Sequence, residues 1–360
     1  MGTHRLIYIR TDGNHEIASG HLMRCLSIAS ACQSLGMEVC FLVSEGESYS
    51  LLKGFLDSED SFRIIRLKTA VYDDLEKELP EVSEILHSCP QKPVYLLDSY
   101  YVTEHYLAAI NPLAKTACLD DLQLFDYPVD LLVNYDVISG EALPSYKAAY
   151  QNAGRLLLGA SYAPLRPQFQ NRPIAVKEQA RSILVTTGGS DPCHFCLRFL
   201  QSVQKNPSAW PFAAAGIQLH IVIGKLNTDK AALYKLPDAL PFLQLHENVT
   251  DMASLMQNCD LAISAAGTTL YELCALGLPA ISFIMADNQI TAARAFDAAG
   301  AIPCGGDIRK APGAVLHSIN TFVTSLSQHS YSARKTAHEA MRKLVDGNGA
   351  LRIAKALGEL

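Results

Sequence analysis

Short apolar runs alternate with segments of helical apolar spacing along most of the chain. This alternation is typical of a parallel α/β architecture, because each buried strand is followed by an amphipathic helix that returns the chain. The runs predict strands at 6–9, 39–43, 94–97, 116–119, 131–133 and 155–158, and then at 182–186, 218–223, 261–264 and 280–283.

A break in the pattern separates these two sets of strands. The segment 159–173, GASYAPLRPQFQNRP, has three prolines and no helical period, which is typical of a connection. We therefore predict an N-terminal α/β domain at 1–158, an interdomain crossover at 159–173 and a C-terminal α/β domain at 174–360. A chain of 360 residues is long enough for two domains. The last predicted helix, about 338–357, contains DGNGA, whose glycines mark a break.

Polar residues follow many of the predicted strands. In the first half they are Asp12, Asp98, Asp120, Asp121 and Asn134, and in the second half they lie at 187–189 and 264–269. Open parallel sheets bind ligands at the carboxyl ends of their strands. The sequence therefore predicts two Rossmann-like domains that face each other across a ligand-binding cleft.

Two motifs of the second half combine small residues with the start of a helix. In TTGGSDP (186–192), the amides of Gly188 and Gly189 could approach an anion beside a helix N-terminus. The alternative is a tight left-handed turn with a Ser or Asp cap. In SAAGTTLYELCALGLPAI (264–281), the candidate ligand contacts are Ser264, Ala266, Gly267, Thr268 and Glu272. Glu272 could bind ribose hydroxyls, or it could only complement the helix dipole.

In the first half, GHLMRCLSIA (20–29) puts a histidine at the start of a helix. Alone, His21 is typical of a cap-region histidine bonded to backbone. The chain has no GxxxxGK[ST], GxGxxG or HExxH motif, which removes the main support for P-loop, dehydrogenase and zinc-protease functions. CHFC (193–196) is a lone CxxC; a helix start can lower a thiol pKa, but nothing pairs with it to make four metal ligands.

Composition narrows the class of partner. The net charge of −6 argues against a general nucleic-acid binder. No apolar run reaches membrane-spanning length, and the N-terminal residues lack a signal-peptide pattern. The ten cysteines lie mostly in apolar segments, which indicates buried thiols in a reducing cytoplasm. We expect a cytoplasmic protein without nucleic-acid or membrane partners.

Nine motifs occur in the order found in one enzyme family: RTDGNHEIASGHLMRCLSIA, LLDSYY, LDDL, DLLVN, LLGASYAPLRPQF, TTGGSDP, ISAAGTTLYELCALGLPAI, ADNQ and LVDGNGALRIAKAL. Together they resemble the UDP-2,4-diacetamido-2,4,6-trideoxy-β-L-altropyranose hydrolases of pseudaminic acid biosynthesis, which are GT-B-like. The resemblance implies hydrolysis of the anomeric C–O bond with inversion, without a metal or cofactor, releasing UDP and the free sugar.

The resemblance also implies site residues. His21 matches the catalytic histidine, Tyr100 the tyrosine after Asp98, and Asn288 the asparagine before Gln289. The sequence departs from the family pattern in two places. Ala18 and Ser19 stand where the family often has Gly-x before Gly-His, and Ser99 stands where it has histidine.

These residues suggest a mechanism. A neutral His21, favoured by the positive end of its helix, takes a proton from water, with Asp12 as the candidate that fixes its tautomer. Gly20 brings the histidine to the cleft, and Arg24 orients it or binds substrate. Tyr100 and Asn288 position the sugar or water, and the glycine-rich turns bind the departing UDP. The alternatives are a GT-B glycosyltransferase using a UDP-amino sugar and a non-catalytic nucleotide-sugar binding protein.

Overall fold

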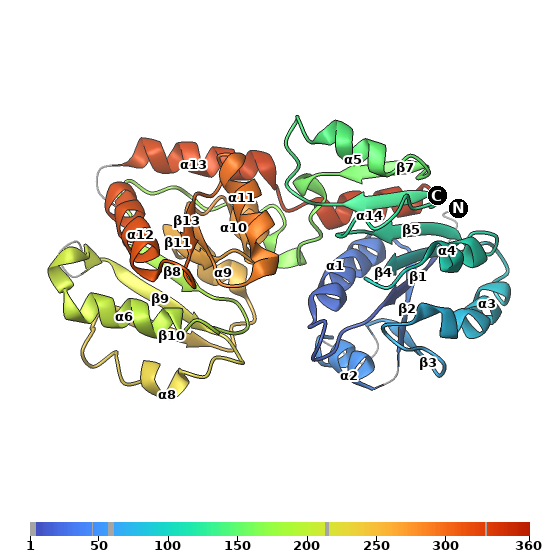
Figure 1. Ribbon diagram of the computed structural model, residues 1–360, viewed down its shortest axis with the longest axis horizontal. Helices are drawn as coiled ribbons and strands as arrows, with labels where there is room; N and C mark the ends of the chain where they lie inside the picture. Colours follow the sequence, from blue (N-terminus) through green and yellow to red (C-terminus); the bar gives the residue numbers. More distant parts are fainter. Residues whose placement is uncertain (1–4, 45, 57–60, 213–215, 328–329) are drawn as a thin grey trace. The chain divides into compact units, whose positions relative to one another are not determined.

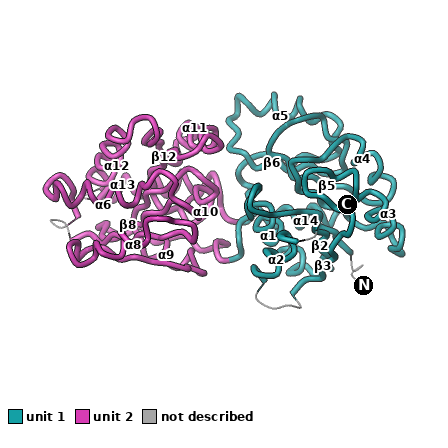
Figure 2. Tube along the Cα trace, turned by 60° about the horizontal axis from the view of Figure 1, so that its bottom comes forward, with its two compact units in different colours: residues 1–167, 348–360 teal, residues 168–347 magenta. Residues whose placement is uncertain are grey.

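The computed structural model describes residues 5–44, 46–56, 61–212, 216–327 and 330–360. The chain divides into two compact units, one of residues 1–167 with 348–360 and one of residues 168–347 (Figure 2). Each unit is built on one parallel sheet with helices packed on it (Figure 1). The predicted class of two Rossmann-like α/β domains is confirmed.

The first unit has a seven-stranded sheet in the order β3-β2-β1-β4-β5-β6-β7. The strands are β1 (Leu6–Thr11), β2 (Glu38–Ser44), β3 (Arg63–Leu67), β4 (Val94–Asp98), β5 (Lys115–Leu119), β6 (Leu131–Asn134) and β7 (Arg155–Leu158). The helices are α1 (Gly20–Ser34), α2 (Glu47–Gly54), α3 (Leu79–His87), α4 (Glu104–Ile110), α5 (Leu143–Ala149) and α14 (Gly349–Gly358), with 3-10 turns η1 (Leu75–Glu78) and η2 (Ala160–Tyr162). Alternate strand residues fill two cores: Ile7 and Ile9 pack in the core that includes α1 and α14, and Tyr8 packs in the core that includes α3 and α4.

The second unit has a six-stranded sheet in the order β10-β9-β8-β11-β12-β13. The strands are β8 (Ser182–Thr186), β9 (Gln218–Ile223), β10 (Leu243–Glu247), β11 (Leu261–Ala265), β12 (Ala280–Ile284) and β13 (Cys304–Asp307). The helices are α6 (Phe195–Lys205), α8 (Lys230–Leu233), α9 (Met252–Gln257), α10 (Thr269–Leu276), α11 (Ile290–Ala298), α12 (Pro312–Ser327) and α13 (Tyr331–Leu344), with η3 (Pro167–Phe169), η4 (Pro207–Ala209) and η5 (Asp287–Gln289). Residues of α6, α8 and α12 share one core with the sheet, and α10 packs against α9 and α13.

All ten predicted strands are present, and the described residues form three further strands that the pattern does not predict. The three are β3, β10 and β13, and each lies at an edge of its sheet. Their sequences are RIIRL, LQLHE and CGGD. An edge strand has only one neighbour and is less enclosed, so it needs no continuous apolar run.

The predicted C-terminal domain is wrong at its end, because residues 348–360 belong to the first unit. The predicted helix at 338–357 is instead the end of α13 and most of α14, separated at 345–348. Gly347 has φ +85°, and a Cβ at Gly349 would collide with the carbonyl oxygen of Ala163. The glycines therefore turn the chain back and let α14 approach the first unit, where Ile353 and Leu357 join the core that includes α1.

Within the described residues, no helix is both long and apolar enough to cross a membrane.

Candidate functional site

Each sheet has one point at which the strand order reverses. In the first unit β1 and β4 are neighbours there, and in the second unit β8 and β11 are neighbours. Loops that leave adjacent strands in opposite directions open a crevice at the carboxyl ends, where α/β proteins bind ligands. Most of the site residues predicted from sequence lie on the loops and helix starts at these two reversals.

At the first reversal, His21 contacts Asp98. His21 is the second residue of α1 and is 4% exposed, and Asp98 is the last residue of β4. The imidazole Nδ1 lies 2.6 Å from Asp98 Oδ1, while Nε2 is buried and has no hydrogen-bond partner among the described residues. An ionised carboxylate only accepts hydrogen bonds, so we assign the proton to Nδ1, which leaves the lone pair of a neutral ring on Nε2.

The expected contact of His21 with Asp12 is therefore wrong. Asp12 Oδ1 accepts hydrogen bonds from the amide and hydroxyl of Ser44, at 2.9 and 2.7 Å. Its Oδ2 pairs with Arg10 Nη1 at 2.5 Å. Ser44 ends β2, the neighbour of β1 on the side away from β4, so Asp12 joins β1 to β2.

Arg24 lies one turn after His21 and joins Asp98 to two further strand ends. Its Nε donates to Asp98 Oδ2 at 2.7 Å, and its Nη2 donates to Oδ1 at 2.5 Å. Its Nη1 donates to Asp121 Oδ2 at 2.7 Å and to the Tyr135 hydroxyl at 2.6 Å. Arg24 thus holds the cluster together, which favours orientation over substrate binding among its two predicted roles. Tyr135 was not predicted; its only signal in the sequence is its place directly after β6.

The electrostatics of this cluster follow from its burial and from the Arg24 charge. Burial alone would raise the pKa of Asp98, but the Arg24 charge and the hydrogen bonds from Arg24 and His21 hold that pKa well below its usual range. Tyr100 is 39% exposed and packs edge-on against His21, with ring centroids 4.4 Å apart. Burial, followed by the charge of Asp121, raises the pKa of the Tyr100 hydroxyl.

The loop before α1 explains one departure from the family pattern. Ala18 has φ +56°, a conformation that costs an L-residue about 1 kcal/mol. The family often has glycine at this position, so Ala18 introduces backbone strain. Gly20 does not have a positive φ, and a Cβ there would meet nothing within 4 Å. The left-handed backbone position of this loop is therefore Ala18 and not Gly20. At the other departure, Ser99 Oγ accepts a hydrogen bond from the Tyr101 amide at 3.2 Å.

At the second reversal, the Gly188–Gly189 turn is exposed and tightly packed on its inner side. Gly188 has φ +81°, and its amide donates to Thr186 Oγ1 at 3.3 Å. The carbonyl oxygen of Gly189 accepts from the Leu226 amide at 2.9 Å. The turn is thus the left-handed one that the alternative interpretation expected, and its exposed edge remains open to a ligand.

The helix that follows this turn has its first amides occupied. The Asp191 carboxylate accepts hydrogen bonds from the amides of Phe195 and Cys196, at 2.8 and 2.9 Å. An anion would therefore find the start of α6 already capped. Burial raises the pKa of both Cys193 and Cys196, the reverse of what a reactive CxxC needs.

The backbone of the second motif is partly used within the fold. The amide of Ala266 donates to Phe283 O, and that of Gly267 donates to Ala265 O, both at 2.9 Å. The Ser264 hydroxyl donates to Ala265 O at 2.9 Å. Each of these donors thus has an internal acceptor, which weakens the interpretation of the three residues as UDP contacts. Their assignment to UDP binding stays a prediction.

The remaining predicted residues of the second unit lie near the same edge of the sheet. Thr268 is exposed and directly precedes α10, on which Glu272 is half-buried. Asn288 is exposed in η5, directly after β12. The Oε1 atom of Gln289 accepts a hydrogen bond from the Met285 amide at 2.9 Å, so Gln289 fixes the turn that carries Asn288.

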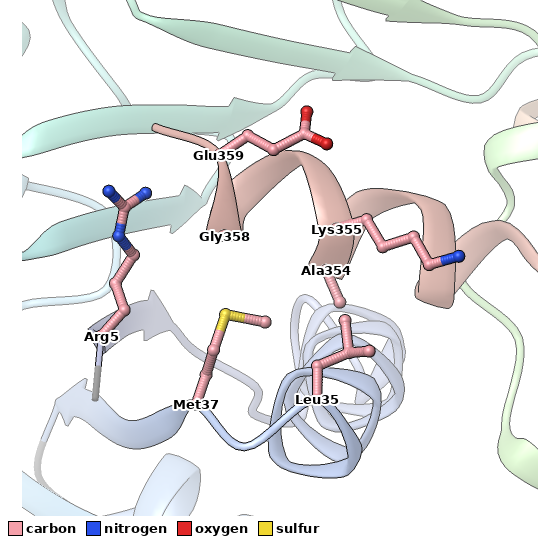
Figure 3. Close-up of a pocket in the computed structure, with 7 residues that line it drawn as sticks. All are labelled: Arg5, Leu35, Met37, Ala354, Lys355, Gly358 and Glu359. Atoms are coloured by element: carbon pink, nitrogen blue, oxygen red, sulfur yellow. The ribbon is translucent and has the colours of Figure 1, made fainter. Parts of the chain in front are cut away.

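One cavity lies away from both reversals. It has a volume of about 330 Å³ and is lined by Arg5, Leu35, Met37, Ala354, Lys355, Gly358 and Glu359 (Figure 3). Leu35 follows the C-terminal end of α1, whereas His21 lies at its N-terminal end. The cavity therefore lies at the amino-terminal edge of the sheet, opposite the edge where ligands bind. No group of three or more His, Cys, Asp or Glu side chains in the described part of the chain is placed to hold a metal ion.

Comparisons with known proteins find similarities for the second unit and for nearly the whole chain. Residues 183–346 match the glycosyltransferase family 28 C-terminal domain, and this match lies within the second unit. The chain is 26% identical to the spore coat polysaccharide biosynthesis protein SpsG of Bacillus subtilis (strain 168) over 359 residues, 98% of this chain and 97% of that protein. It is 25% identical over 284 residues to the pseudaminic acid cytidylyltransferase and UDP-2,4-diacetamido-2,4,6-trideoxy-beta-L-altropyranose hydrolase of Helicobacter pylori (strain ATCC 700392 / 26695), covering 78% of this chain and 44% of that protein.

Among solved structures, the Acinetobacter baumannii MurG structure superposes with a TM-score of 0.61 at 15% identity, covering 99% of this chain and all of that chain. The fold is therefore of the GT-B type.

Proposed function

We propose that this chain is a UDP-sugar hydrolase that uses His21 as the base that activates water. Its substrate would be a UDP-2,4-diacetamido-2,4,6-trideoxyhexose, cleaved at the anomeric C–O bond with inversion and without a metal ion. The observation that carries the proposal is the His21–Asp98 contact, which leaves Nε2 as a buried, unpartnered acceptor at a strand-order reversal. The family 28 match and the Helicobacter pylori relative support a nucleotide-sugar substrate.

The arrangement of the first unit supports general-base catalysis. Asp98 accepts a hydrogen bond from the Nδ1–H group and stays ionised because it pairs with Arg24, so Nε2 can take a proton from water. The proton gained at Nε2 makes an imidazolium, which the carboxylate of Asp98 stabilises. Nε2 is covered in this structure. We assign its uncovering to a movement of the Tyr100 ring, which packs on the imidazole and is half-exposed.

We assign UDP binding to the second unit. The exposed edge of the Gly188–Gly189 turn and the residues around Thr268 supply backbone groups without bulky side chains. Glu272 would accept hydrogen bonds from ribose hydroxyls, and Asn288 would contact the sugar or the water. The released UDP carries negative charge, which amide donors stabilise without a metal ion.

The test is an assay in which the protein meets a panel of UDP-diacetamido sugars with no acceptor present. We expect UDP release, and in H₂¹⁸O the label should enter the free sugar and not the UDP phosphate, because the C–O bond breaks. NMR of the first-formed anomer reports inversion. Excess EDTA should leave the rate unchanged. Loss of activity that an added metal restores would contradict the metal-free mechanism.

Two other outcomes would support the competing functions. UDP release that occurs only with an added alcohol would indicate a glycosyltransferase, which the GT-B fold equally accommodates. Tight binding of UDP-sugars without turnover across the panel would indicate a binding protein.

A further inference from the structure

Two neighbouring aspartates after β5 have different environments. Asp120 is 4% exposed, and both of its carboxylate oxygens are occupied. Oδ1 accepts from the Leu122 amide at 2.9 Å and the Tyr127 hydroxyl at 3.0 Å, and Oδ2 accepts from the Tyr150 hydroxyl at 2.6 Å. Asp120 is therefore a structural residue that fixes the loop after β5.

Asp121 instead belongs to the His21 cluster and has an oxygen to spare. Its side chain is 26% exposed, and its Oδ2 accepts from Arg24 Nη1 at 2.7 Å. No described residue donates a hydrogen bond to Oδ1. Arg24 joins Asp121 to Asp98, the carboxylate that contacts His21. The charge of Asp121 also helps to raise the pKa of the Tyr100 hydroxyl.

The charges in this cluster show that Asp121 is not needed to neutralise Arg24. Asp98 already makes two hydrogen bonds to the guanidinium, through Nε and Nη2. With a neutral His21, the positive Arg24 and the negative Asp98 and Asp121 leave one negative charge in excess. A partly desolvated carboxylate with an unused oxygen, held in place by an arginine, is preorganised to accept a hydrogen bond from a ligand.

We propose that Asp121 selects the substrate by accepting a hydrogen bond at Oδ1 from a hydroxyl or acetamido N–H of the sugar. The inference rests on the proposed function and adds a substrate contact to it. A carboxylate attracts donors and repels anions, so the residue favours neutral sugars that carry a donor and disfavours uronic acid sugars. The diphosphate has only acceptors at neutral pH, so Asp121 does not bind it.

The test measures the effect of Asp121 on sugar recognition separately from its effect on nucleotide binding. The Asp121→Asn variant keeps the shape of the side chain and removes its charge. We expect kcat/KM for the best UDP-diacetamido sugar to fall about 10- to 100-fold, because a charged hydrogen bond contributes about 1.5–3 kcal/mol. The Kd for UDP, measured by calorimetry, should be unchanged. The thermal midpoint should change little, because Arg24 keeps Asp98 and Tyr135 as partners.

Asp120→Asn is the matched control. It removes the charge of the adjacent residue, whose carboxylate has only structural partners. It should therefore lower the thermal midpoint, while the ratio of UDP-sugar to UDP affinity stays at the wild-type value. For both variants this ratio is measured in a His21→Ala background, which allows binding without turnover.

Three results would overturn the inference about Asp121. These are an unchanged kcat/KM in Asp121→Asn, an equal loss of UDP and UDP-sugar affinity, and a loss of thermal stability with an unchanged affinity ratio. A wild-type protein that binds no UDP-sugar would overturn both this inference and the proposed function. If the wild-type protein hydrolyses UDP-sugars and the Asp121→Asn variant hydrolyses them at the same rate, only the inference about Asp121 is overturned.

Discussion

The two strand-order reversals share one geometry and differ in what occupies it. At the β1–β4 reversal, ionisable side chains bond to one another: His21, Asp98 and Arg24 are all largely buried. At the β8–β11 reversal, the loops consist mainly of glycine, alanine, serine and threonine, and the backbone makes most of the contacts.

This difference fits the separate roles that we propose for the two units. Moving a proton requires a side chain with a tuned charge, whereas holding a diphosphate requires only donors that an anion can approach closely. Under the function that we propose, the same scaffold would supply side-chain chemistry in the first unit and backbone binding of UDP in the second. Substitutions on each side should change different measured quantities.

The largest expected effect is on the first unit. His21→Ala removes the only base that we assign, so kcat should fall roughly 10²- to 10⁴-fold, while the Kd for UDP should stay near wild type because binding is assigned to the second unit. Steady-state kinetics and calorimetry measure the two quantities.

The matched control for this substitution is His105→Ala. His105 Nδ1 lies 2.6 Å from Glu76 Oε2, the same distance as in the His21–Asp98 pair, but its side chain is 78% exposed. It should leave kcat unchanged. A His21→Ala variant with near-wild-type kcat would remove the base from the mechanism and with it the contrast between the two units.

Asp98→Asn should have the next largest effect, on rate and stability together. It would favour the wrong imidazole tautomer, which costs roughly 10²- to 10⁴-fold in kcat, and leave Arg24 with less of its buried charge balanced, which costs about 3 kcal/mol of unfolding free energy. The folded-state pKa of Asp98 is lowered, so its stabilising contribution is complete above the unfolded pKa of about 4 and is lost as the pH falls below it.

Urea unfolding at several pH values measures this dependence. The difference between wild type and Asp98→Asn should be constant from about pH 5 to 7 and should shrink below about pH 4. Asp130→Asn is the control. Asp130 pairs with Lys115 at 2.8 Å and has a lowered pKa, and it directly precedes β6, at the amino-terminal ends of the strands. It should show a smaller difference and normal kcat. A difference for Asp98→Asn that grows in acid would contradict the assigned ion pair.

The sequence pattern predicted most of the fold because buried central strands need apolar runs. The pattern carries no strand order, which explains why His21 was paired with Asp12, its neighbour in sequence, and not with Asp98. Only the pairing of β1 with β4 brings Thr11 beside Asp98 and thereby places that carboxylate under α1.

Two other features of the fold could not be predicted from the sequence pattern, because they also depend on contacts between distant segments. The return of α14 depends on a close approach between Gly349 and Ala163, which are far apart in the sequence. The amides of Ala266 and Gly267 look available in a small-residue motif, but they are used by acceptors in the folded chain, one of them on the next strand, β12. Local pattern identifies where polar groups occur, and tertiary pairing decides which of them remain available.

The smallest expected effect is on the second unit and tests whether its glycine turn binds through the backbone. A Cβ at Gly189 would meet nothing within 4 Å, and its φ is not positive, so Gly189→Ala should change the unfolding free energy by less than about 0.5 kcal/mol. If a diphosphate approaches this backbone, the added methyl group should raise the Kd for UDP about tenfold, as calorimetry would measure. Gly140→Ala, equally uncrowded but in the first unit, should leave that Kd unchanged.

Gly188→Ala should in addition cost about 1 kcal/mol of stability, because Gly188 has φ +81°. An unchanged Kd in Gly189→Ala would mean that UDP does not approach this turn, and the assignment of backbone binding to the second unit would then rest on the residues around Thr268 alone.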